Sequence, residues 1–175
     1  MKNINKMITE EIQKENYFNP NWEIENKNSN QWVKIYYQTI EKLIENGAIV
    51  NNYNKLIIKE YVTNSRNEIG EWKYCRHHID EIKISGAIYS QDSEMVDYYK
   101  TDKAILITYA QHLLLHYIII NANTTSPNNG MLKGIANHFI TFENSFNYWN
   151  EVVKEMCNVY NVPYEDNWKD KLSFG

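Results

Sequence analysis

The clearest amphipathic pattern in the chain runs from residue 31 to residue 46, where hydrophobic residues recur every three or four positions and Gly47 follows. This spacing predicts a helix that buries one face and ends at the glycine. A shorter helix is expected over residues 7–17, followed by a polar, asparagine-rich stretch over residues 19–30. Residues 142–160 are expected to form a final helix with its hydrophobic side chains on one side.

The middle of the chain has the pattern of short strands. Residues 55–63, KLIIKEYVT, are rich in β-branched side chains and suggest a strand, although a helix stays open there. Residues 71–84 are expected to be extended, and residues 85–101 form a polar segment rich in turn residues. A short apolar strand is predicted over residues 104–107.

A buried helix is predicted directly after this last strand. Thr108 is a suitable N-cap residue, and Gln111 three positions later completes a capping-box pattern. The residues that follow, through Ile120, are hydrophobic on nearly every side of the helix, so we expect it to be buried. Residues 121–130 are expected to form a loop.

Composition and charge limit the possible classes of protein. The chain has 175 residues, of which 43% are hydrophobic and 14% aromatic, so it can bury a core in one compact unit. Its 18 basic and 22 acidic residues give a net charge of −4, which argues against non-specific coating of DNA but allows a local basic patch. Two cysteines are too few for a disulfide framework or a four-thiolate zinc site. With no apolar run of membrane length and no secretory signal pattern, we expect a cytoplasmic protein without a membrane partner.

Four of the five histidines occur in two close pairs, and these pairs carry the candidate chemistry. His112 and His116 are four positions apart on the predicted buried helix, so their imidazoles share a face and can bind one metal ion. His77 and His78 follow the strand-like run WKYCR, where neighbouring side chains point to opposite sides. One of them can therefore supply a third ligand while the other faces the substrate as a base. Three histidine ligands leave coordination positions open, as catalytic metal sites do.

The runs YCRHHIDEI and ILITYAQHLLLHYII resemble the HNH (His-Me finger, ββα-metal) endonucleases, in the branch that includes colicin-type and phage enzymes. The resemblance extends from Glu71 to Ile120 and implies a β-hairpin and a helix around one divalent cation. It implies three metal ligands, His77, His112 and His116. It also implies that His78 is the general base that takes a proton from the attacking water.

One position departs from the family pattern. Where the family has an asparagine at the start of the second strand, this chain has Lys103, in the run KAILIT. Lysine donates hydrogen bonds but accepts none, so the loop carrying the base would be held in another way, for example through Asp102. Arg76 and Lys103 are candidates to hold phosphate groups and join His78 in the expected catalytic set. A lysine is also common on any protein surface, and for Lys103 alone this simpler interpretation is favoured.

Other residues near the histidine pairs are interpreted as structural. Asp80 and Glu81 are alternative candidate ligands, although the interpretation as solvated loop residues is favoured, and Cys75 is expected to be a small core residue. His138 belongs to neither pair and is expected to be structural or on the surface.

We therefore expect an α+β fold in which a ββα-metal (His-Me finger) core is embedded in a mostly helical small domain. The expected organisation is an N-terminal helical extension over residues 1–60, a nuclease-like core over residues 61–122 and a C-terminal helical region over residues 123–175. We expect these three regions to form one compact unit.

The resemblance implies a metal-dependent HNH endonuclease of a phage, mobile element or restriction system, acting on DNA, double-stranded by preference. Its cofactor would be one divalent ion, Mg, Mn, Ni or Zn, and a homodimer is possible. The alternative is a catalytically silent protein that kept the fold and binds DNA or regulates a nuclease. A secreted nuclease toxin is the least favoured interpretation.

Overall fold

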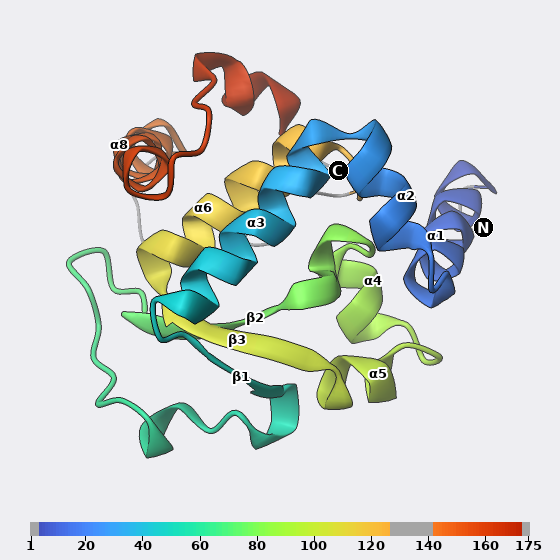
Figure 1. Ribbon diagram of the computed structural model, residues 1–175, viewed down its shortest axis with the longest axis horizontal. Coiled ribbons are helices and arrows are strands. Elements are labelled where there is room, and N and C mark those ends of the chain that lie inside the picture. Colours follow the sequence, from blue (N-terminus) through green and yellow to red (C-terminus); the bar gives the residue numbers. More distant parts are fainter. Residues whose placement is uncertain (1–3, 127–141, 173–175) are drawn as a thin grey trace.

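A computed structural model describes residues 4–126 and 142–172 of the chain, with only the backbone described at residues 142–145. Its centre is a three-stranded antiparallel sheet with the strand order β1-β3-β2 (Figure 1). The strands are β1 (Ile49–Asn52), β2 (Tyr74–His78) and β3 (Lys103–Thr108). A small antiparallel sheet among many helices confirms the predicted α+β class.

Helices account for most of the remaining structure. The α-helices are α1 (Ile4–Phe18), α2 (Trp22–Ser29), α3 (Gln31–Glu45), α4 (Gly86–Gln91), α5 (Val96–Thr101), α6 (Tyr109–Ala122) and α8 (Phe142–Tyr160). The short 3-10 helices are η1 (Tyr53–Lys55), η2 (Ile58–Glu60), η3 (Ile79–Ile82) and η5 (Asp166–Lys171). Helices α3 and α6 pack side by side on one face of the sheet, and α8 packs on α6 (Figure 1). Across the described ranges, no helix has both the length and the apolar character needed to cross a membrane.

The helices predicted with the clearest start and stop signals are confirmed. Helix α3 begins after Asn30, whose side chain accepts hydrogen bonds from two backbone N–H groups, and is followed by Gly47 with a positive φ of 94°. At the start of α6, the Thr108 hydroxyl accepts from the Gln111 N–H at 3.2 Å, and the Gln111 side chain accepts from the Thr108 N–H at 2.9 Å. This is the predicted capping box, and the helix that it opens is buried.

The predicted strand over residues 55–63 is wrong. That segment contains η2 and irregular backbone, whereas the additional strand is β1, which pairs with β3 so that Val50 lies opposite Ile105. The apolar side chains of residues 55–63 have another use, since Leu56 is fully buried against β3 residues on the face of the sheet away from α3. The hydrophobic side chains of residues 55–63 therefore indicate a segment that packs on the sheet, and they do not show that the segment is a strand.

Two segments interpreted as polar linkers contain helices. Residues 19–30 include α2, which is anchored by the buried Trp22, and residues 85–101 include α4 and α5. These helices are only six to eight residues long, too short for a hydrophobic repeat to become visible. The expected loop over residues 121–130 begins later than predicted, because α6 continues through Ala122, and residues 127–130 lie outside the described part.

Candidate metal centre

Strand β2 separates the two members of its histidine pair. His77 and His78 are paired with consecutive residues of β3, and their side chains leave opposite faces of the sheet. On one face, the His77 ring lies near His112 and His116 of α6, with ring centroids 5.1 and 5.3 Å away. The predicted alternation of the two neighbours is therefore realised, and His77 is the member that meets the helix.

The three predicted metal ligands come together. One ring nitrogen from each of His77, His112 and His116 lies within 4.8 Å of the other two. The closest pair is Nε2 of His112 and Nε2 of His116, which are 3.0 Å apart. A tetrahedral zinc ion bound at about 2.0–2.1 Å places two ligand nitrogens about 3.3 Å apart. The spacing of these donors fits such an ion.

The hydrogen bonds of Tyr36 determine which nitrogen of His77 is available. The Tyr36 hydroxyl lies 2.8 Å from His77 Nε2 and 3.0 Å from the Ile79 carbonyl oxygen. Since its single proton goes to the carbonyl, the hydroxyl accepts from Nε2–H, which leaves the lone pair on Nδ1. Nδ1 is buried and makes no hydrogen bond to any described residue. A buried lone pair without a donor fits a metal ligand.

Cys75 has the equivalent role for His112. Its Sγ lies 3.2 Å from His112 Nδ1 and 3.9 Å from the Ile107 carbonyl oxygen. A thiol that donates to Ile107 accepts from Nδ1–H, so the lone pair of His112 is on Nε2, the atom facing His116. Metal-binding histidines typically have their second nitrogen fixed in this way.

Burial keeps the three imidazoles neutral. It lowers the pKa of His112 to about 4 and holds the pKa values of His77 and His116 well below the usual range. Neutral imidazole is the form that coordinates a metal, so at neutral pH a metal ion does not have to displace the extra proton of a charged imidazolium from these rings.

A carboxylate that was expected to face solvent lies at the same place. Glu81, in η3, has its Oε2 3.4 Å from His77 Nδ1 and 3.9 Å from His116 Nε2. Its side chain is 19% exposed, and burial raises its pKa to about 7. The favoured interpretation of Glu81 as a solvated loop residue is therefore wrong.

His78 lies in a cage of tyrosines on the other face of the sheet. Its ring stacks on Tyr53 at 4.2 Å, and the Tyr99 and Tyr89 rings are 4.3 and 5.0 Å away. The side chain is 5% exposed, and neither ring nitrogen has a hydrogen-bond partner within the described structure. Burial lowers the pKa of His78 to about 4, against the opposing effect of Asp102. The imidazole is neutral, as a base must be, but it is enclosed.

The other two expected catalytic residues differ in their position relative to His78. Arg76 is on the same face of β2 as His78, where its guanidinium covers the Tyr53 ring at 3.8 Å and donates to the Tyr53 carbonyl at 2.7 Å. Lys103 is exposed at the start of β3. The structure therefore groups Arg76 with His78, whereas Lys103 alternates with Ala104, the residue paired with His78, and so belongs to the face of Ile105 and His77. The three candidate metal ligands lie across the sheet from His78.

Asp102 accepts three hydrogen bonds at the start of β3. Its carboxylate accepts from the hydroxyls of Tyr17 at 2.7 Å and Tyr89 at 2.6 Å, and from the Lys103 N–H at 3.0 Å. These bonds connect α1 and α4 to the start of β3.

Sequence reasoning missed two residues that contact the candidate metal ligands, Tyr36 and Cys75, and considered Glu81 only as a less favoured alternative ligand. Cys75 could have been found, because it precedes His77 by two positions on a strand and so shares its face. The turn at η3 that brings Glu81 back, and the meeting of Tyr36 with β2, depend on tertiary packing. His138 lies outside the described residues.

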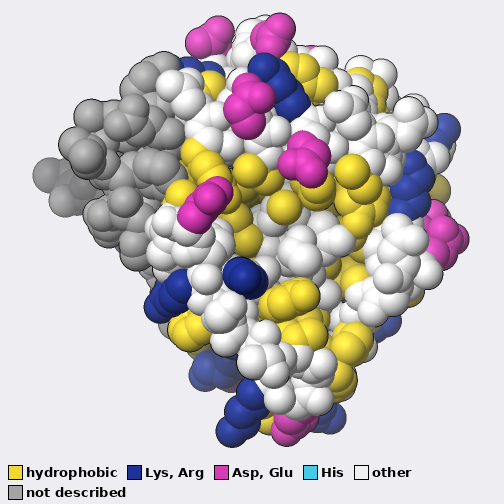
Figure 2. All heavy atoms as spheres, turned by 90° about the vertical axis from the view of Figure 1, so that its left-hand side faces the viewer, with side chains coloured by type: hydrophobic (Ala, Val, Ile, Leu, Met, Phe, Trp, Pro, Cys, Tyr) yellow, Lys and Arg dark blue, Asp and Glu magenta, His cyan; other side chains and the backbone are white. Residues whose placement is uncertain are grey.

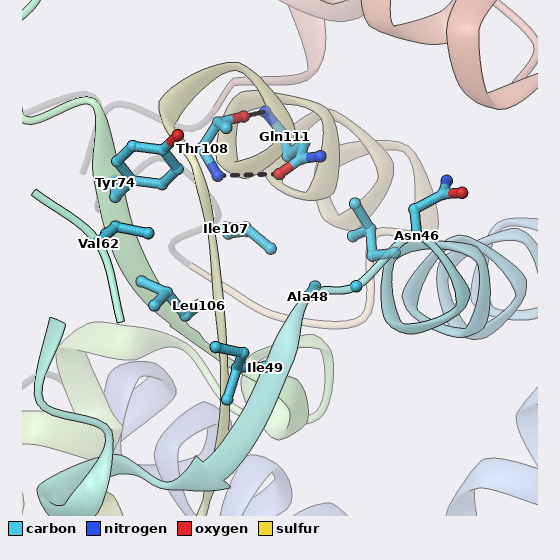
Figure 3. Close-up of a pocket in the computed structure, with 11 residues that line it drawn as sticks. Asn46, Ala48, Ile49, Val62, Tyr74, Leu106, Ile107, Thr108 and Gln111 are labelled. Atoms are coloured by element: carbon cyan, nitrogen blue, oxygen red, sulfur yellow. Dashed lines mark hydrogen bonds between the residues drawn. The ribbon is translucent and has the colours of Figure 1, made fainter. Parts of the chain in front are cut away.

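A separate pocket of about 200 Å³ lies between the end of α3, β1, β3 and the start of α6. Figure 3 shows that hydrophobic side chains such as Ile49, Leu106 and Ile107 line it, with the Thr108–Gln111 capping box at one edge. None of the four histidines in the described part of the chain lines this pocket. On the face drawn in Figure 2, hydrophobic side chains alternate with polar ones and no imidazole is visible, in agreement with the burial of His77, His78 and His116.

Comparisons of the chain with models of known protein families, with curated proteins and with solved structures found no match. The chemistry of the site therefore has to be inferred from its own residues. Those residues are three convergent imidazoles that could bind a metal ion, and an enclosed fourth imidazole across the sheet.

Proposed function

We propose that the protein binds one transition-metal ion through His77, His112 and His116 and is a metal-dependent endonuclease of the HNH (His-Me finger) type. The observation that carries the proposal is the convergence of a strand-end histidine and a helical HxxxH pair, in the order strand, strand and helix that the ββα-metal resemblance implies. Imidazole donors favour Zn, Ni or a similar ion over Mg.

The roles of the chain's own residues follow from their chemistry. His78, neutral at pH 7, would take a proton from water as its oxygen attacks phosphorus, while the bond to the 3′ oxygen breaks and a 5′-phosphate remains. Arg76 and Lys103 would contact the phosphates of the DNA. A bound divalent ion supplies stabilisation of the negative charge that develops on the phosphate.

His78 can act in this way only when its tyrosine cage opens. Tyr89 lies in α4 and Tyr99 in α5, so displacement of these two short helices would expose the imidazole. DNA binding would have to supply the free energy for this displacement.

A second candidate is a metal-binding protein of the same fold without turnover. It is favoured by one observation, the enclosure of both His78 ring nitrogens among tyrosine rings. Its metal site would serve stability or regulation, and its partner would be DNA or a nuclease.

Plasmid DNA incubated with the protein and Mg, Mn, Ni or Zn separates the two candidates. An endonuclease should cut in at least one ion, and His78→Ala should lower the rate by about 10²–10⁴-fold while leaving metal binding intact. Stoichiometric metal binding with no cutting of DNA in any ion supports the second candidate. A protein that binds none of these ions contradicts both.

A further inference from the structure

The Glu81 carboxylate lies against two members of the histidine cluster. Its Oε2 is within 4 Å of donor atoms from two of the three histidines, Nδ1 of His77 and Nε2 of His116. At 3.4 Å from Nδ1 the carboxylate nevertheless makes no hydrogen bond to it, and Nδ1 has no other partner among the described residues. A carboxylate oxygen and a buried ring nitrogen without a hydrogen bond therefore face each other.

No lysine or arginine of the described structure forms an ion pair with Glu81. The lysine nearest in sequence, Lys83, pairs instead with Asp80, at 2.7 Å. A largely buried carboxylate is costly unless it is protonated or faces a cation. A metal ion held by the histidines beside Glu81 would supply such a cation.

The backbone next to Glu81 leaves room for this orientation. A Cβ added at Gly86, the first residue of α4, would lie 2.6 Å from Glu81 Oε1. Gly86 is not among the glycines with positive φ, so what it provides is space rather than an unusual backbone conformation. Any larger residue at position 86 would displace the carboxylate.

We propose that Glu81 is a fourth protein ligand, so that the resting protein holds its ion with three histidines and one glutamate. The inference rests on the proposed metal binding and adds to it. Four protein ligands close a tetrahedral site, as in structural zinc centres, whereas three leave a position for water or substrate. Glu81 would then have to leave the ion before a phosphate could bind there.

Substitution with Co(II), whose visible absorption reports its ligands, tests the assignment without measuring activity. The wild-type protein, Glu81→Gln and Asp80→Asn are titrated with cobalt, and inorganic phosphate is then added. Asp80→Asn is the matched control, because it removes the neighbouring carboxylate that pairs with Lys83. Circular dichroism confirms that each variant is folded.

We expect Glu81→Gln to weaken cobalt binding by about 10–100-fold or more, since even loss of outer partners of metal ligands costs that much. Its spectrum should change when phosphate is added, whereas the spectra of the wild type and Asp80→Asn should not. Gly86→Ala should weaken binding in the same direction, because its methyl group displaces the carboxylate.

Equal cobalt affinity and identical spectra for the wild type and Glu81→Gln would overturn the assignment of Glu81 and leave the three-histidine site standing. Failure of the folded wild-type protein to bind any cobalt would overturn the metal site itself, and with it the role of Glu81. A phosphate-induced spectral change in the wild type would show an open position and would also overturn the closed site.

Discussion

The two faces of β2 give neighbouring histidines opposite environments. His77 and His78 are both buried and both have a pKa lowered by burial. Around His77 lie other polar groups: the imidazoles of α6, the Glu81 carboxylate and the Tyr36 hydroxyl. Around His78 lie the faces of tyrosine rings. His77 therefore has neighbours with which it could bind a cation, whereas the adjacent residue His78 has none in the described structure.

The tyrosine hydroxyls explain why His78 has no partner. The Tyr89 hydroxyl donates to Asp102 at 2.6 Å, and the Tyr99 hydroxyl donates to the Tyr53 hydroxyl at 3.3 Å. With these groups directed elsewhere, the rings contribute apolar contact only. The His77 face is thus suited to bind metal as it stands, whereas the His78 face has to open before it can do chemistry.

The largest expected effect is a difference in zinc affinity between the two faces. His116→Ala removes one of the convergent nitrogens and should weaken zinc binding by more than the approximately 100-fold that outer-shell substitutions reach. His78→Phe, which keeps an aromatic ring in the tyrosine cage, should leave the affinity nearly unchanged. Competition with a chromophoric chelator measures both constants, and equal losses in the two variants would contradict the separation of the faces.

The pH dependence of the unfolding free energy should show whether His78 is enclosed as a neutral imidazole in the folded protein. Its pKa is about 4 in the folded protein and near 6.5 in an unfolded chain, so the unfolded chain binds more protons at acidic pH. The metal-free protein should therefore lose up to about 3 kcal/mol of unfolding free energy from this residue as the pH falls from 6.5 to 4.

Urea denaturation of the wild type and His78→Phe at several pH values isolates that contribution, because the other histidines are common to both proteins. The difference in unfolding free energy between the two should grow as the pH falls. A constant difference would mean that His78 is not enclosed in solution.

The second coordination sphere can be examined with adjacent tyrosines of α3. Tyr36→Phe removes the hydroxyl that fixes the His77 ring and should weaken zinc binding by about 10–100-fold. Tyr37→Phe is the matched control, since the Tyr37 hydroxyl is buried with no hydrogen-bond partner in the described part of the chain. It should leave zinc affinity unchanged and stability equal or higher. Similar zinc affinities in the two variants would remove Tyr36 from the site.

The sequence predicted best those parts of the fold that local chemistry determines. The capping box at Thr108 and the apolar repeat of α3 are signals contained within one segment. Strand β1 carries no such signal, because four residues become a strand only by pairing with β3. The same distinction applies to residues 55–63, whose hydrophobic side chains meet the sheet without joining it.

The candidate site divides in a similar way. The spacing of His112 and His116 on a helix and the alternation of His77 and His78 on a strand predicted that one strand histidine would meet the helical pair. The choice of His77 came from the family resemblance. The orientation of Glu81 depends on the turn at η3 and on the space at Gly86, and neither is visible as a pattern. The enclosure of His78 depends on tyrosines from three separate elements, η1, α4 and α5.

The smallest expected effect concerns Cys75, the hydrogen-bond partner of His112. Burial raises the pKa of this thiol to about 12, so in the metal-free protein it is a neutral thiol that accepts from His112 Nδ1–H. Sulfur is a weak acceptor, so Cys75→Ala should weaken zinc binding by only about tenfold, the lower end of the outer-shell range. Cys157→Ala removes a buried sulfur from the core and should leave the affinity unchanged. A loss as large as that of His116→Ala would instead make Cys75 a ligand, and the face of β2 that carries His77 would then supply two donors to the metal rather than one.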